Sequence, residues 1–397
     1  MSEYPSDWKL IPIREIITES RINPELDDPS KRISVRLHCE GVEKRSERAT
    51  DQAGATRYYK RLAGQFIYGK QNLHKGAVGI VPEELDGFCS SQDIPAFDIT
   101  PSVDPNWFLH LFRQRNFYES LENIATGTGS KRIQPSELGE KEIAVPPLPE
   151  QKKIAEILSG IDFAVSSIQK KIDKLRSAKV ALAESELIGE HHSNQANSEI
   201  GFIPSHWQVK GILEVSSVAS GQVDPTSKEY RDMILIAPNH IESGTGKIIG
   251  KETAIQQAAI SGKYFAKLGA VILSKIRPNL AKVCMADQDC LTSADMYPLT
   301  AMSRITPAYL KQVLLSKRFT HYATESSVRG NIPKINREEL GGYKFALPPL
   351  DEQMTITAGI ESIETIIFKE EERVGLLLGL KNSLSSDLLS GRKRVSV

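Results

Sequence analysis

The sequence has no long hydrophobic run and few cysteines. Across its 397 residues, apolar stretches never reach the roughly 18 residues that a transmembrane helix requires. The first residues lead directly into charged sequence, so we expect no signal peptide, no membrane association and a cytoplasmic protein. The cysteines at positions 39, 89, 284 and 290 form no C-x-x-C pair, which is typical of reduced thiols and argues against a zinc site.

Motifs of several nucleotide-dependent enzymes are also absent. The Pro-Pro pairs at 146–147 and 348–349 lack the preceding polar residue and the following aromatic of the loop with which an amino-methyltransferase holds a flipped base. No G-x-G-x-x-G follows a predicted strand. Residues 64–70 match G-x-x-x-x-G-K, but Gln71 replaces the Ser or Thr that would bind Mg²⁺. We therefore expect neither catalysis nor a cofactor in this chain.

The eight histidines form no H-E-x-x-H motif or similar spacing. His191 and His192 lie in a polar segment and are most simply solvated, with metal binding as the remoter alternative. The sequence therefore predicts no metal site.

The positive signal is a stretch that occurs twice. Residues 138–151 are LGEKEIAVPPLPEQ and residues 340–353 are LGGYKFALPPLDEQ, with eight of fourteen positions identical at an offset of 202. Other parts repeat in the same order: PSDW at 5–8 matches PSHW at 204–207, and SQD at 91–93 matches SAD at 293–295. The stretches 20–60 and 217–262 differ freely. The pattern predicts two similar domains with different contents.

A long apolar-periodic segment follows each Pro-Pro pair and predicts helices over about 149–188 and 351–390. Acids at Glu150, Asp351 and Glu352 suit the starts of these helices. A heptad seam runs along both helices, and Lys179 and Lys381 occupy the same slot in each. The connectivity favours antiparallel packing of the two. The predicted seam residues are Ile154, Leu158, Ile161, Val165, Ile168, Ile172, Leu175, Lys179, Leu182, Ile356, Ile360, Ile363, Ile367, Val374, Leu377, Lys381, Leu384 and Leu388.

Within the first half, short strands alternate with turns and one helix. Strands are predicted at 33–37, 65–69, 77–81 and 96–99, and apolar residues at helical spacing predict a single helix over 105–124. The fold class is therefore α+β: two pseudo-repeated mixed domains separated by two long antiparallel coiled-coil helices. The predicted divisions are a domain at 1–147, a spacer helix at 148–189, a linker at 190–203, a domain at 204–347 and a distal helix at 348–391.

Charge is balanced overall but segregated along the chain. Lys plus Arg and Asp plus Glu are both 50, yet residues 30–75 carry eleven basic and four acidic residues, and residues 263–282 carry five basic residues and no acid. Basic side chains neutralise DNA phosphates, and Asn or Gln can read adenine. The DNA-binding candidates are Arg57, Lys60, Arg61, Lys70, Gln71, Asn72, Lys75, Lys263, Lys267, Lys275, Arg277, Asn279 and Lys282. The alternative is that they are solvated strand edges that prevent aggregation.

The doubled PPL-x-EQ stretch before a heptad helix, with Trp8 and Trp207 opening the two halves, resembles the specificity subunit of type I restriction–modification enzymes. Further similar stretches are 66–70 and 87–93 in the first half and 237–242, 244–246 and 272–278 in the second. The resemblance covers essentially the whole chain. One departure is that residues 72–74, Asn-Leu-His, stand where the second half has Arg-Pro-Asn at 277–279, which removes a basic residue.

The resemblance implies a non-catalytic scaffold. Each half would be a target recognition domain that reads one part of a split, asymmetric double-stranded DNA sequence, and the helices would set the gap. Two methyltransferase subunits would dock on the spacer and methylate adenine with S-adenosylmethionine. Motor-nuclease subunits that use ATP and Mg²⁺ would complete the restriction complex. Those cofactors would belong to the partners.

Two other function classes compete with this one. A coiled-coil adaptor could bridge two proteins without meeting DNA, although the basic clusters argue against it. A stand-alone nuclease or methyltransferase is disfavoured because the sequence lacks a cofactor loop and a metal-ligand cluster.

Overall fold

The computed structural model describes residues 4–26, 28–47, 56–127, 131–327 and 333–396. It divides into two compact units, each of which is described by itself. Unit 1 combines residues 1–169 with 372–397, and unit 2 is formed by residues 170–371. Each of the two long helices therefore contributes one part to each unit. Among the described residues, no helix combines the length and the apolar character needed to cross a membrane.

Unit 1 contains a four-stranded antiparallel sheet of order β2-β9-β6-β7. Three two-stranded pairs, β1-β10, β3-β4 and β5-β8, surround it. Its elements are β1 (Lys9–Pro12), β2 (Ile17–Ser20), β3 (Ile33–Val35), β4 (Val42–Lys44), β5 (Tyr58–Lys60), β6 (Phe66–Tyr68), β7 (Val78–Ile80), β8 (Cys89–Ser91), β9 (Ala96–Ile99), α1 (Pro105–Phe112), α2 (Arg115–Ser120), α3 (Pro135–Gly139), β10 (Glu142–Val145), the first part of α4 (Leu148–Glu186) and the last part of α9 (Leu350–Leu389).

Unit 2 repeats this order. Its four-stranded antiparallel sheet runs β14-β20-β17-β18, and a three-stranded sheet, β15-β19-β16, lies beyond it. Its elements are β11 (Gln195–Ser198), β12 (Gly201–Pro204), β13 (Gln208–Gly211), α5 (Ile212–Val215), β14 (Ser216–Val218), β15 (Leu235–Ile236), β16 (Tyr264–Ala266), β17 (Val271–Ser274), β18 (Val283–Met285), β19 (Cys290–Thr292), β20 (Met296–Ala301), α6 (Pro307–Leu315), α7 (Lys317–Ser326), α8 (Arg337–Gly342), β21 (Lys344–Leu347) and the remaining parts of α4 and α9.

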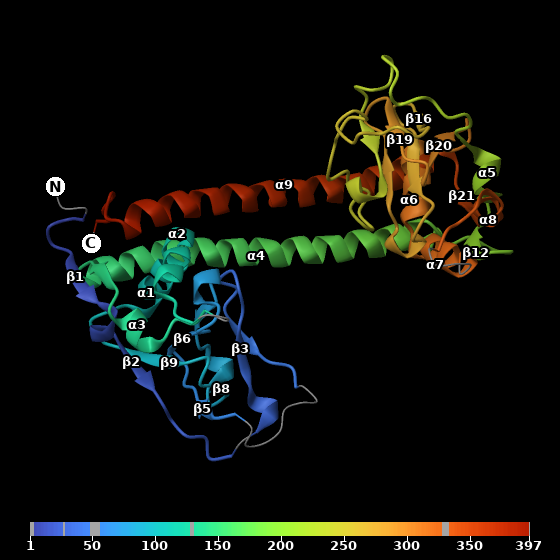
Figure 1. The fold of residues 1–397 in the computed structure, drawn as a ribbon. Coiled ribbons are helices and arrows are strands. Elements are labelled where there is room, and N and C mark those ends of the chain that lie inside the picture. Colours follow the sequence, from blue (N-terminus) through green and yellow to red (C-terminus); the bar gives the residue numbers. More distant parts are fainter. Residues whose placement is uncertain (1–3, 27, 48–55, 128–130, 328–332, 397) are drawn as a thin grey trace. The chain divides into compact units, whose positions relative to one another are not determined.

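The core of unit 1 has three layers: sheet, α1 and the long helices. Phe66 of β6 lies 4.9 Å, between ring centroids, from both Phe108 and Phe112 of α1. These rings share a buried cluster with Ile154 and Leu158 of α4. Figure 1 shows α1 in this position, between the sheet and α4. Burial of such large apolar side chains is worth roughly 1.5–3 kcal/mol each, so this layer fixes the domain on its helix.

The single helix predicted over 105–124 is wrong: it is split into α1, α2 and the 3₁₀ turn Leu121–Ile124. The start is as expected, since Asp104 accepts hydrogen bonds from the backbone N–H of Asn106 and Trp107. The break falls at Gln114, whose backbone is extended (φ −68°, ψ 124°). Unit 2 has the same break at Ser316, between α6 and α7 (ψ 150°). Helical spacing of apolar residues continues across both breaks, which is why periodicity alone missed the first one.

The long helices pack against each other in an antiparallel manner within each unit. In unit 2, Lys171 pairs with Glu370 and Lys179 pairs with Glu364, so the partner positions fall as those of α4 rise. In unit 1, Ile154 and Leu158 share a core with Leu388. Every predicted seam residue is buried or half-buried.

The segment expected as a linker, 190–203, is more ordered than a connecting loop. Residues 195–198 and 201–204 form the antiparallel hairpin β11-β12. The side chain of Gln195 donates hydrogen bonds to the backbone carbonyls of Gly189 and His192, which ties the hairpin to the end of α4. Polar composition had suggested a loop, but here it supplies the hydrogen bonds that fold the segment.

Candidate nucleic-acid interface

The doubled PPL-x-EQ stretch forms the same corner in both units. Gln151 is buried; its Oε1 accepts from the N–H of Asp104, and its Nε2 donates to the carbonyls of Ser102 and Pro146. Gln353 makes the equivalent three bonds, to Thr306, Arg304 and Pro348. In both units these three hydrogen bonds therefore fix the domain to the start of its long helix.

The preceding glutamate in each corner holds the tryptophan that opens the half. Trp8 Nε1 donates to Glu150 over 3.2 Å, and Trp207 Nε1 donates to Glu352 over 2.8 Å. A carboxylate that accepts such a bond orients the indole ring. The Pro-Ser-x-Trp and PPL-x-EQ motifs, far apart in the sequence, thus form one structural unit.

The repeated lysines of the seam are ion-paired. In unit 1, Lys381 Nζ pairs with Asp162, and Arg113, which follows α1, approaches the same carboxylate at 3.4 Å. In unit 2, Lys179 and Lys311 both pair with Glu364, at 3.1 and 3.4 Å. Asp162 and Glu364 differ by the repeat offset of 202. Each acid therefore joins a helix lysine to a cation of the adjoining domain.

In unit 1, one set of basic and amide side chains lies at the end of β6, where the segment 131–133 packs beside it. The N–H of Ile133 bonds the carbonyl of Lys70, and the N–H of Lys70 bonds the carbonyl of Asp93. This brings residues 131–132 beside the turn that carries Gln71 and Lys75. We call the set the first basic edge; it consists of Lys70, Gln71, Asn72, Lys75, Lys131 and Arg132.

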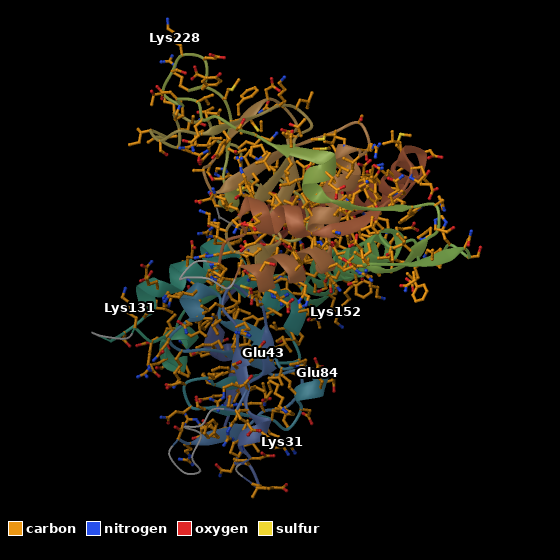
Figure 2. The ribbon with its side chains drawn as sticks, turned by 90° about the vertical axis from the view of Figure 1, so that its right-hand side faces the viewer. Lys31, Glu43, Glu84, Lys131, Lys152 and Lys228 are labelled. Atoms are coloured by element: carbon orange, nitrogen blue, oxygen red, sulfur yellow. The ribbon has the colours of Figure 1, made fainter. Side chains whose placement is uncertain are left out.

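The first basic edge is solvent-accessible. Gln71, Lys75 and Lys131 are exposed, whereas Lys70, Asn72 and Arg132 are half-buried. Figure 2 shows Lys131 at the periphery of unit 1. Acids temper the edge, since Lys131 pairs with Glu122 at 2.9 Å and Arg132 with Asp93 at 3.6 Å. Exposed pairs of this kind are weak, so a phosphate could replace the carboxylate.

Unit 2 has the equivalent construction. The N–H of Ile335 bonds the carbonyl of Lys275, the N–H of Lys275 bonds Asp295, and the N–H of Arg277 bonds Pro333. Lys275 Nζ lies 5.3 Å from the centroid of the Tyr297 ring. We call this set the second basic edge; it consists of Lys275, Arg277, Lys334 and Arg337.

The charges of the second basic edge are close enough to influence one another. The pKa of Lys275 is lowered, first by burial and then by the nearby positive charge of Lys334 and Arg337. Arg277, Lys334 and Arg337 are exposed. Such a cluster attracts phosphate, because an anion relieves the repulsion between the cations.

Sequence reasoning missed Lys131, Arg132, Lys334 and Arg337. They follow the α1–α2 and α6–α7 regions, about sixty residues after the strands that they approach. The available signal was the offset of 202, which relates Arg132 to Lys334 and Ile133 to Ile335. That match was not distinctive without knowledge of the backbone pairing.

The side chains of three predicted DNA-binding cations form hydrogen bonds within their own domains. Arg61 is 1% exposed; its guanidinium donates to Ser90 Oγ and to the carbonyls of Ser20 and Ile94, and burial lowers its pKa to about 10. Lys263 is buried and donates to Ser261, and Lys282 donates to the carbonyl of Pro238. We leave these three out of the basic edges.

Three more of the predicted residues lie in or next to β5 and β16. Arg57 is exposed with its guanidinium over the Tyr59 ring, Lys60 is half-buried in β5, and Lys267 is exposed after β16.

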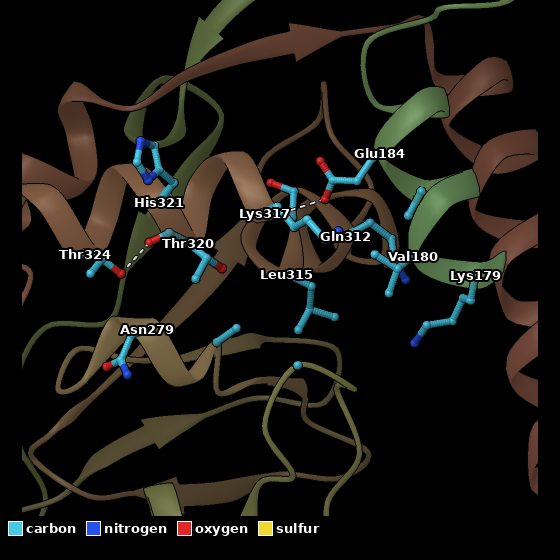
Figure 3. A pocket seen from close by; sticks show the side chains of 14 residues that line it. Lys179, Val180, Glu184, Asn279, Gln312, Leu315, Lys317, Thr320, His321 and Thr324 are labelled. Atoms are coloured by element: carbon cyan, nitrogen blue, oxygen red, sulfur yellow. Dashed lines mark hydrogen bonds between the residues drawn. The ribbon is translucent and has the colours of Figure 1, made fainter. Parts of the chain in front are cut away.

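The last candidate, Asn279, lines a groove in unit 2. The groove has a volume of about 430 Å³ and lies between α4, α7 and the turn at residues 278–281. Figure 3 shows Asn279 facing Thr320 and Thr324, with Lys179 on the opposite side. The N–H of Lys317 bonds Glu184 of α4 across it. Its floor is largely apolar, with Leu315 and Val180, and is unlike a phosphate-binding surface.

Comparison with known proteins agrees with this architecture. The family model described as type I restriction modification DNA specificity domain matches residues 47–177 and 204–375. The EcoDI specificity subunit of Escherichia coli is 30% identical over 316 residues, which are 74% of this chain and 70% of that protein. The MjaVIII specificity subunit of Methanocaldococcus jannaschii is 28% identical over 302 residues, which are 72% and 70%. Both are named as parts of type I restriction enzymes.

Solved structures extend the likeness of fold to nearly the whole chain. The crystal structure of a type I restriction–modification S subunit from M. genitalium aligns over 96% of both chains, with a TM-score of 0.59 at 15% identity. A chain from a structural study of assembly and conformational transition in the type I system aligns over 99% of this chain, with a TM-score of 0.55.

Two similar α+β domains, each with a basic edge and each seated on an antiparallel helix pair, define a DNA-recognition subunit. The chain belongs to the type I restriction–modification DNA specificity family. Its role there is recognition and not catalysis, and the family favours DNA reading over a protein adaptor.

Proposed function

We propose that each half of this chain reads one part of a bipartite, asymmetric double-stranded DNA sequence, and that the paired helices set the gap between the parts. Residues 1–147 and 204–347 are the two target recognition domains. The observation that carries the proposal is the matched position of the two basic edges, built on the same backbone hydrogen bonds in both units.

Within each domain, the basic edge and the variable stretch have different roles. The cations of the basic edges hold phosphates, which positions the domain without reading sequence. Base reading falls to the segments that differ between the halves, within 20–60 and 217–262. Gln71 of the first edge is an amide that can also read adenine in the major groove.

The helices supply a docking surface for partners. Leu376 and Leu380 lie one turn apart on α9 and are 76% and 50% exposed, and Phe163 of α4 is 76% exposed. All three belong to unit 1. Large apolar side chains on the outside of a paired helix favour contact with further helices. We assign this surface to methyltransferase subunits, two per chain, which methylate adenine with S-adenosylmethionine; motor-nuclease subunits use ATP and Mg²⁺.

The test is DNA binding by the chain co-purified with its methyltransferase subunits. Fluorescence anisotropy should show binding to one bipartite site that weakens steeply between 50 and 200 mM salt. Changing the gap by one base pair, with both parts intact, should remove the specific component. Binding that ignores sequence and gap at all salt concentrations would overturn the proposal.

A second arm tests the docking surface. Replacing Leu376 and Leu380 by Glu should reduce co-purification of the methyltransferase subunits, because charge disfavours an apolar interface. Replacing Asn382, which is exposed on another face of the same helix, by Glu is the matched control and should leave co-purification intact. Full co-purification with the Leu double variant would show that the methyltransferase subunits bind another surface.

A further inference from the structure

A cluster of two imidazoles and one carboxylate lies at the corner of unit 2. His206 Nε2 lies 2.7 Å from Glu352 Oε1, and His192 Nε2 lies 3.7 Å from Glu352 Oε2. One ligand atom from each of the three residues can be chosen so that all lie within 4.8 Å of one another. Zn²⁺ binds such atoms at about 2.0–2.2 Å, which places tetrahedral ligands roughly 3.3 Å apart. Small rotations of the side chains would satisfy that geometry.

The three ligands come from segments that the fold already fixes. His192 follows α4, and its N–H bonds the carbonyl of Gly189. His206 lies in the turn between β12 and β13, and Glu352 is in the first turn of α9. Trp207 stands between them: its Nε1 orients the Glu352 carboxylate, and its ring packs edge-on against that of His192 at 5.5 Å. A partner that orients a ligand in this way is typical of metal sites.

The equivalent corner of unit 1 shows what the cluster lacks. Applying the offsets of 202 and 199, His192 corresponds to Arg394, His206 to Asp7 and Glu352 to Glu150. In unit 1 the Arg394 guanidinium donates to both carboxylates, at 2.6–2.9 Å. Unit 1 therefore carries its own permanent cation between the start of the domain and the start of the helix. Among the described residues of unit 2, no arginine is bonded at the equivalent place, which offers two nitrogen donors and one carboxylate.

We propose that His192, His206 and Glu352 bind a divalent transition metal ion, with Zn²⁺ as the best fit, which takes the place that Arg394 fills in unit 1. Two imidazoles and one carboxylate suit Zn²⁺, whereas Mg²⁺ and Ca²⁺ prefer sites built of oxygen ligands alone. The side chains are 38%, 46% and 29% exposed, so water can complete the coordination and the ion can enter. The ion ties the end of α4, the opening of the domain and the start of α9 together.

The experiment is zinc titration of the full-length chain, without a polyhistidine tag and after removal of metals with EDTA. Isothermal titration calorimetry should give one equivalent of Zn²⁺ per chain. His192→Ala and His206→Ala should each weaken binding at least tenfold. His191→Ala is the matched control, because the neighbouring His191 bonds Ser185 and stands outside the cluster; it should bind as the unchanged chain does.

A second variant keeps the test sharp if the alanine variants fold poorly. The double variant His192→Arg, His206→Asp copies the corner of unit 1, so it should fold, lose zinc binding and lose the rise in melting temperature that zinc gives the unchanged chain. Absence of saturable binding by the unchanged chain would overturn the proposal. Equal binding by the double variant would overturn it as well.

Discussion

The two halves hold their helices with the same hydrogen bonds but with different cations. Gln151 and Gln353 make equivalent sets of three bonds, and both glutamates accept from a tryptophan. Beside these bonds, unit 1 uses Arg394 and unit 2 has two histidines. The hydrogen bonds that fix each domain to its long helix are therefore the same in both units, whereas the charged side chains beside those bonds differ.

The recognition segments differ more than the corners do. Unit 1 has the small hairpin β3-β4 and the pair β5-β8, whereas unit 2 has the three-stranded sheet β15-β19-β16, which includes a parallel pair. The four-stranded sheets next to them keep the same order. Because the four-stranded sheet and the corner are the same while the added strands differ, each half can change the DNA sequence that it reads and still stay fixed to its helix.

The largest expected effect breaks the shared corner. Replacing Gln151 or Gln353 by Leu leaves a backbone N–H and two carbonyls without partners, which should cost about 3 kcal/mol of stability in either half. Scanning calorimetry measures it as a fall of several degrees in melting temperature. Lys152→Ala, at the exposed neighbouring position, should change it little. A large loss in only one half would show that the corners are not equivalent.

Acid should destabilise unit 1 through one buried histidine, His110. His110 is buried, and burial, with Lys381 and Arg113 nearby, lowers its pKa to about 4. The unfolded chain therefore binds a proton that the folded one does not, so stability is full above pH 6.5 and falls as pH drops toward 4. The loss should reach about 3 kcal/mol.

The matched change is His110→Gln, because the offset of 202 places Gln312 at the equivalent position. Urea unfolding at several pH values should show a flatter profile for this variant between pH 6.5 and 4. An unchanged profile would assign the acid sensitivity to other groups.

The ion-paired seam predicts an asymmetry between an acid and its lysine. Glu364→Gln leaves Lys179 and Lys311, both about 10% exposed, without a counter-charge and should cost about 2 kcal/mol. Lys179→Met replaces the charge with an apolar side chain that suits the seam, so it should be nearly neutral. Asp162→Asn in unit 1 should behave like Glu364→Gln. Equal losses for Glu364→Gln and Lys179→Met in urea unfolding would contradict this account of the seam.

The smallest expected effect concerns phosphate contacts. Lys275→Ala and Arg277→Ala should each reduce the slope of log K against log salt by about 1 for the methyltransferase complex, without changing the preferred sequence. Lys282→Ala is the control, since its ammonium group bonds the Pro238 carbonyl. A slope that responds to Lys282 and not to Arg277 would place the DNA on another face.

Much of the frame could be predicted from the sequence, because it depends on local periodicity. The two long helices and the strands β6, β7 and β9 agree with expectation within two residues. The split at Gln114 could not be predicted, because the break lies in the backbone and apolar spacing continues through it.

The candidate site was less predictable, because it depends on contacts between distant segments. Basic residues look alike in sequence, whether buried as Arg61 is or exposed as Arg277 is. Lys334 joins the second basic edge through the backbone pairing of residues 333–335 with residues 275–277, which are about sixty positions earlier in the chain. The cluster that contains His192 was hidden for the same reason, since its other members lie 14 and 160 residues further along the chain.

The most direct test of independent reading by the two halves is a map of methylated adenines in cells that contain the methyltransferase partner. Residues 20–135 would be exchanged for those of another family member, with the corner and helices kept. One part of the methylated sequence should change, while the other part and the gap stay the same. A change in both parts together would contradict the claim that each half reads on its own.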